Sequence, residues 1–174
     1  PPTTCRRQRQ MCIRDSRDLN IDGAERDGVI PALDFLTASN RLGMGDDLSS
    51  DETDRYFAEG RRVVVIGGGD TAMDCVRTAI RQKAASVSCL YRRDRANMPG
   101  SAREVMNAEE EGVNFEWLTM PEGFEGGDAV EAVRCSKIHL GQPDATGRRV
   151  PEPIPGSSYF KEADLVIKLS LIHI

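Results

Sequence analysis

A run of four β-branched residues followed by three glycines constrains this 174-residue chain more than any other feature. The run Val-Val-Val-Ile (63–66) is typical of a strand that is buried on both faces of a parallel sheet. The glycines end that strand, and residues 70–82 then place apolar side chains at helical spacing. Because residues 86–91 read as a second strand, the segment predicts one βαβ unit with a right-handed crossover.

The glycine run matches the pattern G-x-G-x-x-A, which is typical of a dinucleotide-binding loop. Gly67 permits a tight turn, Gly69 lets the backbone approach a pyrophosphate, and Ala72 keeps helix and strand close. The free amides at the start of the helix favour negative charge. The alternative is a glycine turn used only for packing. Without G-K-[ST] the loop is no P-loop. The predicted cofactor-binding residues in this loop are Gly67, Gly68, Gly69, Asp70, Thr71 and Ala72.

The residues after the second strand predict which dinucleotide binds. An NAD site usually has Asp or Glu here for the ribose 2′-OH, whereas this chain has Arg92 and Arg93. Two guanidinium groups can hold a 2′-phosphate through charge-assisted hydrogen bonds. We therefore expect NADPH rather than NADH, with Arg95 as a further candidate. The alternative is a solvated basic loop in which Asp94 is the partner.

The rest of the chain predicts an α/β fold. Ser101 and Glu104 form a capping-box pattern at the start of a helix that Gly112 ends, and residues 113–118 follow as a third strand. Residues from about 121 to 160 read as an antiparallel meander with turns at 126–128 and 144–147. Residues 163–167 return as a buried strand. The expected fold class is a Rossmann-like parallel sheet with helices on both faces and an inserted antiparallel β-meander.

The two ends and the region before the first strand are less regular. The strings MCIRDS (11–16) and LSLIHI (169–174) resemble translated adapter sequence, so we expect residues 1–16 and 169–174 to be non-native tails. Residues 29–42 have a helical stripe behind Pro31. Residues 43–60 read as a connection with one helical turn near 54–58.

Composition excludes several classes of function. There are 23 Lys and Arg against 28 Asp and Glu, a net charge of −5, which argues against a nucleic-acid-binding face. No apolar stretch approaches the about 20 residues of a membrane span, and no secretory signal opens the chain. Five cysteines without C-x-x-C spacing and only two His predict no metal site. An odd number of cysteines favours a reducing cytoplasm.

Three strings together resemble a known family. GRRVVVIGGGDTAMDCVRTAIRQ (60–82), YRRDRANMPGSAREVMNAEEEGV (91–113) and ADLVIK (163–168) are similar to the NADPH-binding domain of glutamate synthase small (β) subunits. That family belongs to the pyridine-nucleotide flavoprotein oxidoreductases, and the resemblance covers residues 17–168. It implies that NADPH reduces FAD, and that electrons pass through Fe–S clusters to a large subunit that makes glutamate from 2-oxoglutarate and glutamine-derived ammonia.

The resemblance also implies what this chain lacks. The cysteine-rich Fe–S region and the FAD-binding unit have no counterpart here, so we expect an NADPH-binding module that is inactive alone. Residues 17–60 would lead in from the missing FAD domain, and residues 61–168 would form the NADPH-binding domain. We assign no catalytic residue, because hydride chemistry belongs to the cofactors while the protein positions them.

Alternative functions use the same module. One is another flavoprotein, such as a dihydropyrimidine dehydrogenase-like or ferredoxin-reductase-like protein. Thioredoxin reductase is disfavoured because its C-x-x-C dithiol is absent. A second alternative is a non-catalytic NADPH-sensing domain. A methyltransferase is disfavoured because Arg92 and Arg93 replace the acid that would bind an adenosine ribose.

Overall fold

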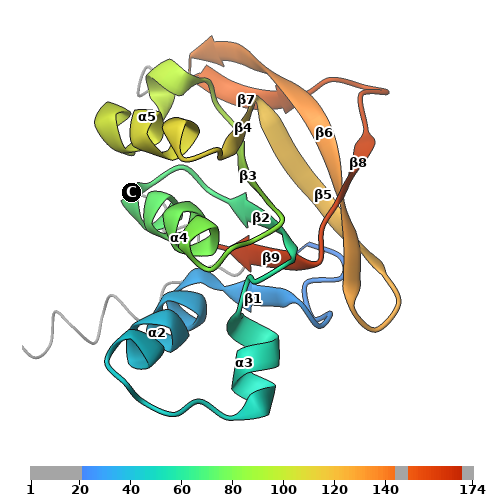
Figure 1. The fold of residues 1–174 in the computed structure, drawn as a ribbon. Helices are drawn as coiled ribbons and strands as arrows, with labels where there is room; N and C mark the ends of the chain where they lie inside the picture. The colour runs from blue at the N-terminus through green and yellow to red at the C-terminus, as the bar shows by residue number, and fades with distance from the viewer. Residues whose placement is uncertain (1–20, 144–148, 170–174) are drawn as a thin grey trace, which may run out of the picture.

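The structure is a computed structural model that describes residues 21–143 and 149–169. Among these residues, five strands form a parallel sheet in the order β1-β9-β2-β3-β4, and β6 pairs antiparallel with β5, β7 and β8 (Figure 1). The elements are β1 (Val29–Pro31), α2 (Ala32–Gly43), α3 (Ser50–Tyr56), β2 (Arg62–Ile66), α4 (Asp70–Arg81), β3 (Ser86–Tyr91), η1 (Arg95–Asn97), α5 (Ala102–Glu110), β4 (Asn114–Trp117), β5 (Thr119–Gly126), β6 (Val130–Pro143), β7 (Arg149–Pro153), β8 (Tyr159–Glu162) and β9 (Leu165–Lys168).

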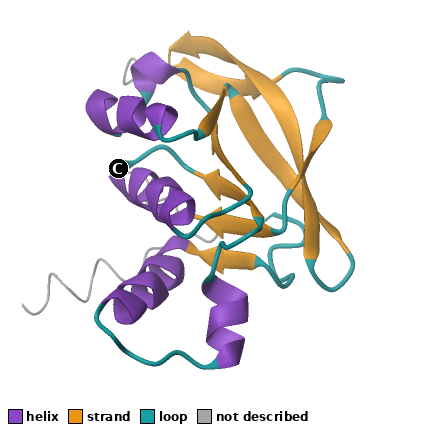
Figure 2. Ribbon diagram, in the orientation of Figure 1, coloured by secondary structure: helices purple, strands orange, loops and turns teal. Residues whose placement is uncertain are grey.

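The predicted parallel sheet and inserted meander are confirmed, but the expected helices on both faces are not. Helices α2, α4 and α5 cover one face, and the antiparallel sheet covers the other (Figure 2). The reason lies in the crossovers. From β1 to β2, β3 and β4 the chain moves across the sheet in one direction, so right-handed connections stay on one face. The connection from β4 back to β9 moves the opposite way and therefore lies on the other face.

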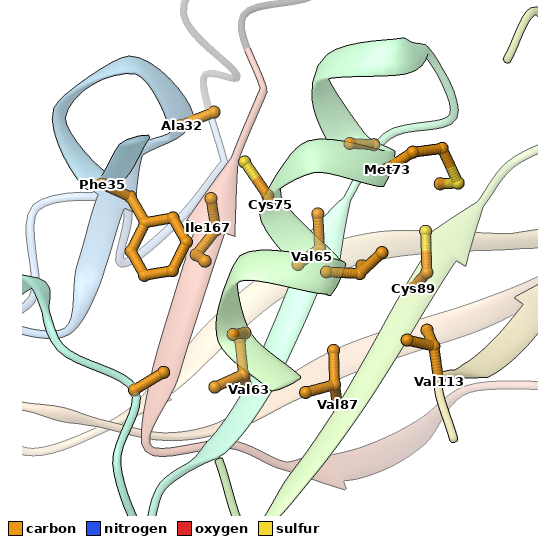
Figure 3. Packing of buried hydrophobic residues seen from close by; sticks show 14 of the residues in the cluster. Ala32, Phe35, Val63, Val65, Met73, Cys75, Val87, Cys89, Val113 and Ile167 are labelled. Carbon is orange, nitrogen blue, oxygen red and sulfur yellow. The ribbon is translucent and has the colours of Figure 1, made fainter. Parts of the chain in front are cut away.

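Alternation along the strands divides the core into two layers. Val63 and Val65 of β2 face the helices, where Figure 3 shows them beside α4. Val64 and Ile66 face the meander. This is the strand buried on both faces that the β-branched run predicted. Burial on each side fixes β2, and with it the loop that follows.

The structure corrects the expectation of one helix over residues 29–42. Val29–Pro31 is strand β1, which pairs with β9, and the helix begins only at Ala32. Arg26 also donates from Nη1 to the Phe124 carbonyl at 2.7 Å, which ties this region to the meander. The region before β2 therefore contributes one edge strand of the parallel sheet, while the expected domain boundaries stay a prediction.

Two helix starts also differ from expectation. The expected single turn near 54–58 is instead α3, whose N-cap Ser49 and Glu52 form a capping box. The capping box expected at Ser101 is not formed, because the Glu104 carboxylate pairs with Arg77 of α4 at 2.7 Å. The predicted turn at 144–147 and most of both predicted tails lie outside the described residues.

Candidate dinucleotide-binding site

The glycine-rich loop lies at the carboxyl end of β2, the central strand. Gly67 and Gly68 are buried, and Gly69 is half-buried. The Gly67 amide donates to the Leu90 carbonyl of β3 at 3.1 Å, so the loop leaves the sheet next to that strand. The order of strands along the chain reverses between β2 and β9, beside this loop. In open α/β sheets, ligands bind at the carboxyl ends of the strands at such a reversal.

Each of the three glycines has its own structural setting. Gly67 has φ +149°, which side chains rarely adopt. A Cβ atom on Gly68 would lie 2.5 Å from two ring carbons of Tyr91, so packing excludes it. A Cβ atom on Gly69 would meet nothing within 4 Å. The space beside Gly69 is therefore open, which fits the close approach of a ligand to the backbone.

The start of α4 presents amides that have no acceptor within the helix, and they lie beside that space. Gly69 is the N-cap and has no side chain with which to cap the helix. Its carbonyl accepts from Ala72 at 2.9 Å, and no intrahelical acceptor exists for the amides of Asp70 and Thr71. Their side chains are exposed, whereas Ala72 is fully buried against the sheet. The helix start thus combines amides that lack an intrahelical acceptor with the positive end of the helix dipole.

Arg92 and Arg93 directly follow β3, the strand next to β2. Both are half-buried, and within the part of the chain that the structure describes neither forms an ion pair with a carboxylate. The Nε atom of Arg93 is buried without a hydrogen-bond acceptor among the described residues. A buried donor without a partner costs about 1–3 kcal/mol, so the site favours an anion.

Asp94 and Arg95, which follow the arginine pair, form contacts with other residues. Asp94, the alternative partner, accepts at 2.9 Å from the Asn97 amide and caps η1. Arg95, the further candidate for phosphate binding, pairs with Glu109 of α5 at 3.0 Å. Among the described residues, the ion pair between Asp94 and the arginine pair that the solvated-loop alternative expects is therefore not formed. Arg95 is engaged by Glu109 of α5.

Two contacts to the loop and to the helix start behind it were missed from sequence. The Gly100 amide donates to the Gly68 carbonyl at 3.0 Å, and the Ser101 amide donates to Asp70 Oδ1 at 3.3 Å. These contacts join segments that are far apart in the sequence. The only local signal is the Pro-Gly-Ser turn at 99–101.

A cavity of about 550 Å³ lies at the opposite, amino-terminal edge of the parallel sheet. Its lining includes Arg62, Ser86 and Asn114, each at the start of a strand, and Lys161 and Glu162 of β8. Arg62 pairs with Glu162, and Lys161 pairs with Glu116. The charged groups at this edge thus neutralise one another, and it carries none of the candidate residues.

The strand order and the glycine-rich loop at its reversal define a Rossmann-type α/β fold. The structure resembles FprA from Mycobacterium tuberculosis in complex with NADPH, with a TM-score of 0.68 and 19% identity over 88% of this chain and 47% of that chain. At this identity the likeness concerns the fold. A family model described as pyridine nucleotide-disulphide oxidoreductase matches residues 15–158. The chain belongs to the pyridine nucleotide-disulphide oxidoreductase family.

Relatives with higher sequence identity belong to one group of proteins within this family. The chain is 64% identical, over 89% of its length, to a putative glutamate synthase [NADPH] small chain of Cereibacter sphaeroides. It is 57% identical, over 90% of its length, to the glutamate synthase [NADPH] small chain of Azospirillum brasilense. It spans 37% and 32% of those two proteins, so it corresponds to about a third of each. Within the described residues, no helix is long and apolar enough to cross a bilayer.

Proposed function

We propose that this chain is the NADPH-binding part of the small subunit of an NADPH-dependent glutamate synthase. The arginine pair, which has no carboxylate partner among the described residues, lies at the end of the strand beside the glycine-rich loop and carries the NADPH assignment. The identity of 64% and 57% to glutamate synthase small chains supports the choice among flavoproteins that use this module.

The described residues fit such a cofactor. In the proposal, the open backbone at Gly69 and the amides of Asp70 and Thr71 hold the pyrophosphate. Arg92 and Arg93 bind the 2′-phosphate, and this contact supplies the acceptor that Arg93 Nε lacks within residues 21–143 and 149–169. NADPH supplies a hydride when bound. The chain's own task is to bind and orient it, so no general acid or base is required of these residues.

The remaining chemistry is assigned to parts of the longer protein. We propose that the full subunit, which we place in the cytoplasm, holds FAD, and that electrons continue through Fe–S clusters to a large subunit that forms glutamate. This chain alone would bind NADPH without oxidising it. In the full-length subunit combined with the large subunit, the proposal requires glutamate formation that depends on NADPH.

Calorimetric titration with NADPH and with NADH tests the proposal. Each charge-assisted hydrogen bond contributes about 1.5–3 kcal/mol, so the wild type should prefer NADPH by tenfold or more, and a variant with both Arg92→Ala and Arg93→Ala should lose that preference. A matched control with Arg55→Ala and Arg81→Ala removes two exposed charges from α3 and the end of α4. It should bind like the wild type. An unchanged preference in the first variant would refute the role of the arginine pair.

A further inference from the structure

The segment between β3 and α5 packs against the glycine-rich loop. We define residues 97–101 as the covering loop. Its start is held by Tyr91, whose hydroxyl donates to the Asn97 carbonyl at 3.0 Å. Its end contacts the glycine-rich loop, where the Gly100 amide donates to the Gly68 carbonyl at 3.0 Å. The covering loop therefore spans from the end of β3 to the glycine-rich loop.

Gly100 is close enough to Gly68 that its lack of a side chain matters. A Cβ atom on Gly100 would lie 3.1 Å from the Gly68 carbonyl oxygen and 3.6 Å from the Gly69 carbonyl carbon. The Tyr91 ring occupies the space where a Gly68 side chain would lie. The peptide between Gly68 and Gly69 is thus held by Gly100 and by Tyr91.

This hold has a directional consequence. A trans peptide is planar, so its carbonyl oxygen and its amide hydrogen point in opposite directions. Because the Gly68 carbonyl is directed at the Gly100 amide, the Gly69 amide is directed away from the covering loop. Gly69 is also the glycine whose surroundings are open. The Gly100 contact thereby sets the orientation of the amide at the proposed pyrophosphate position.

We propose that Gly100 is a positioning residue for cofactor binding, which acts by fixing the peptide between Gly68 and Gly69. This inference rests on the proposed NADPH binding at this loop. The covering loop comes shortly after the arginine pair that would bind the 2′-phosphate. Its Gly100 end orients the amide that would bind the pyrophosphate.

The test compares two ligands in the 174-residue chain. NADPH would use both the arginine pair and the glycine-rich loop, whereas 2′-AMP has the 2′-phosphate but no pyrophosphate. For Gly100→Ala we expect NADPH affinity to fall about tenfold while 2′-AMP affinity stays unchanged. The control is Gly127→Ala in the turn between β5 and β6, where a Cβ atom would meet nothing within 4 Å. That variant should bind both ligands like the wild type.

A second variant keeps the test independent of folding of the first. Tyr91→Phe removes the hydrogen bond to Asn97 but keeps the ring against Gly68, and it should weaken NADPH about two- to fivefold without changing 2′-AMP binding. Thermal melts without ligand monitor the fold of every variant. Equal losses for both ligands, or wild-type NADPH affinity in both variants, would overturn the positioning role. A wild-type chain that binds neither ligand would instead overturn the proposed function.

Discussion

Arg62 and Asp164 join the starts of two neighbouring strands through three hydrogen bonds. Arg62 donates to the carboxylate from Nη2 at 2.6 Å, from Nε at 2.9 Å and from its backbone amide at 2.9 Å. The Arg62 hydrogen bonds hold the pKa of Asp164 at about 2, against an ordinary value of 3.8. A single carboxylate thus joins β2 to β9 at the amino-terminal edge of the sheet.

This contact should make stability depend on pH in the acid range. The folded-state pKa is lower than the unfolded value, so the ionised Asp164 stabilises the fold above about pH 4, and that contribution is lost as pH falls toward about 2. Asp164→Asn should therefore be less stable than the wild type at pH 7. The difference in stability should shrink as the pH falls from about 4 to about 2. Urea denaturation at a series of pH values measures this. Asp128→Asn, in an exposed turn, is the control, and a wild-type advantage that persisted unchanged to pH 2 would contradict the prediction.

At the scale of elements, Arg77 joins α4 to α5. It is three-quarters buried and contacts Glu104 at 2.7 Å and Glu111 at 2.9 Å. Glu109 belongs with Glu111 to an acidic run over residues 109–111 at the end of α5, and it pairs with Arg95 of η1. Acidic residues near the end of a helix oppose its dipole, and these ion pairs are the compensation. The acidic run thus helps to hold α5 against the two elements that flank the site.

Removing this link should loosen α5. Arg77→Ala loses two ion pairs of a partly buried network, and we expect a loss of about 1–2 kcal/mol in the free energy of unfolding. Arg81→Ala on the same helix removes an exposed guanidinium and should cost only a few tenths. Urea denaturation of both variants gives the comparison. Equal losses in the two would mean that the ion pairs contribute nothing beyond helix propensity.

The parts of the fold that could be predicted from sequence are those that depend on interactions between residues close together in the chain. The strand, glycine turn and helix over residues 63–82 were predicted because their signals are local. Val29–Pro31 was assigned to the wrong element because its strand pairing partner, β9, lies far along the chain. The position of β9 also sets the direction of the connection from β4 to β9. That direction places the meander on one face of the sheet and leaves the helices on the other.

The candidate site shows the same limit. The glycine positions and the arginine pair were visible as motifs, and whether they bind NADPH stays a prediction. Gly100 was missed because its contact with Gly68 joins two separate segments. Ser101 and Glu104 have the capping-box spacing in the sequence. No capping box forms, because the Glu104 carboxylate pairs with Arg77 instead. At Ser49 an equivalent pattern was overlooked, although it forms the capping box of α3.

For the whole molecule, the parallel sheet is shared by two apolar layers, and both layers contain free cysteines. Cys75 and Cys89 lie in the layer on the helix side, and Cys135 lies in the layer on the meander side. All three are buried, and burial raises the pKa of each thiol to about 12. At neutral pH almost no thiolate is present in the folded state, so these cysteines are inert toward alkylation.

Thiol labelling should therefore report global unfolding. In a variant with Cys5→Ser and Cys12→Ser, the three remaining thiols should resist iodoacetamide at pH 7.5 without denaturant. They should become reactive together as urea unfolds the chain, since both layers depend on the same sheet. Mass spectrometry of the labelled protein measures this. Complete labelling of Cys135 before Cys75 and Cys89 would show that the meander opens independently.

The position of β9 between β2 and β1 has a consequence for synthesis on the ribosome. About 100 residues separate the end of β2 from the start of β9. At ~5–20 residues per second, β2 waits ~5–20 s before its second neighbour is translated. During that interval the β-branched strand β2 has an open edge, which is a template for pairing with another nascent chain. Translation speed over the meander therefore bears on how much of this protein is recovered folded rather than aggregated.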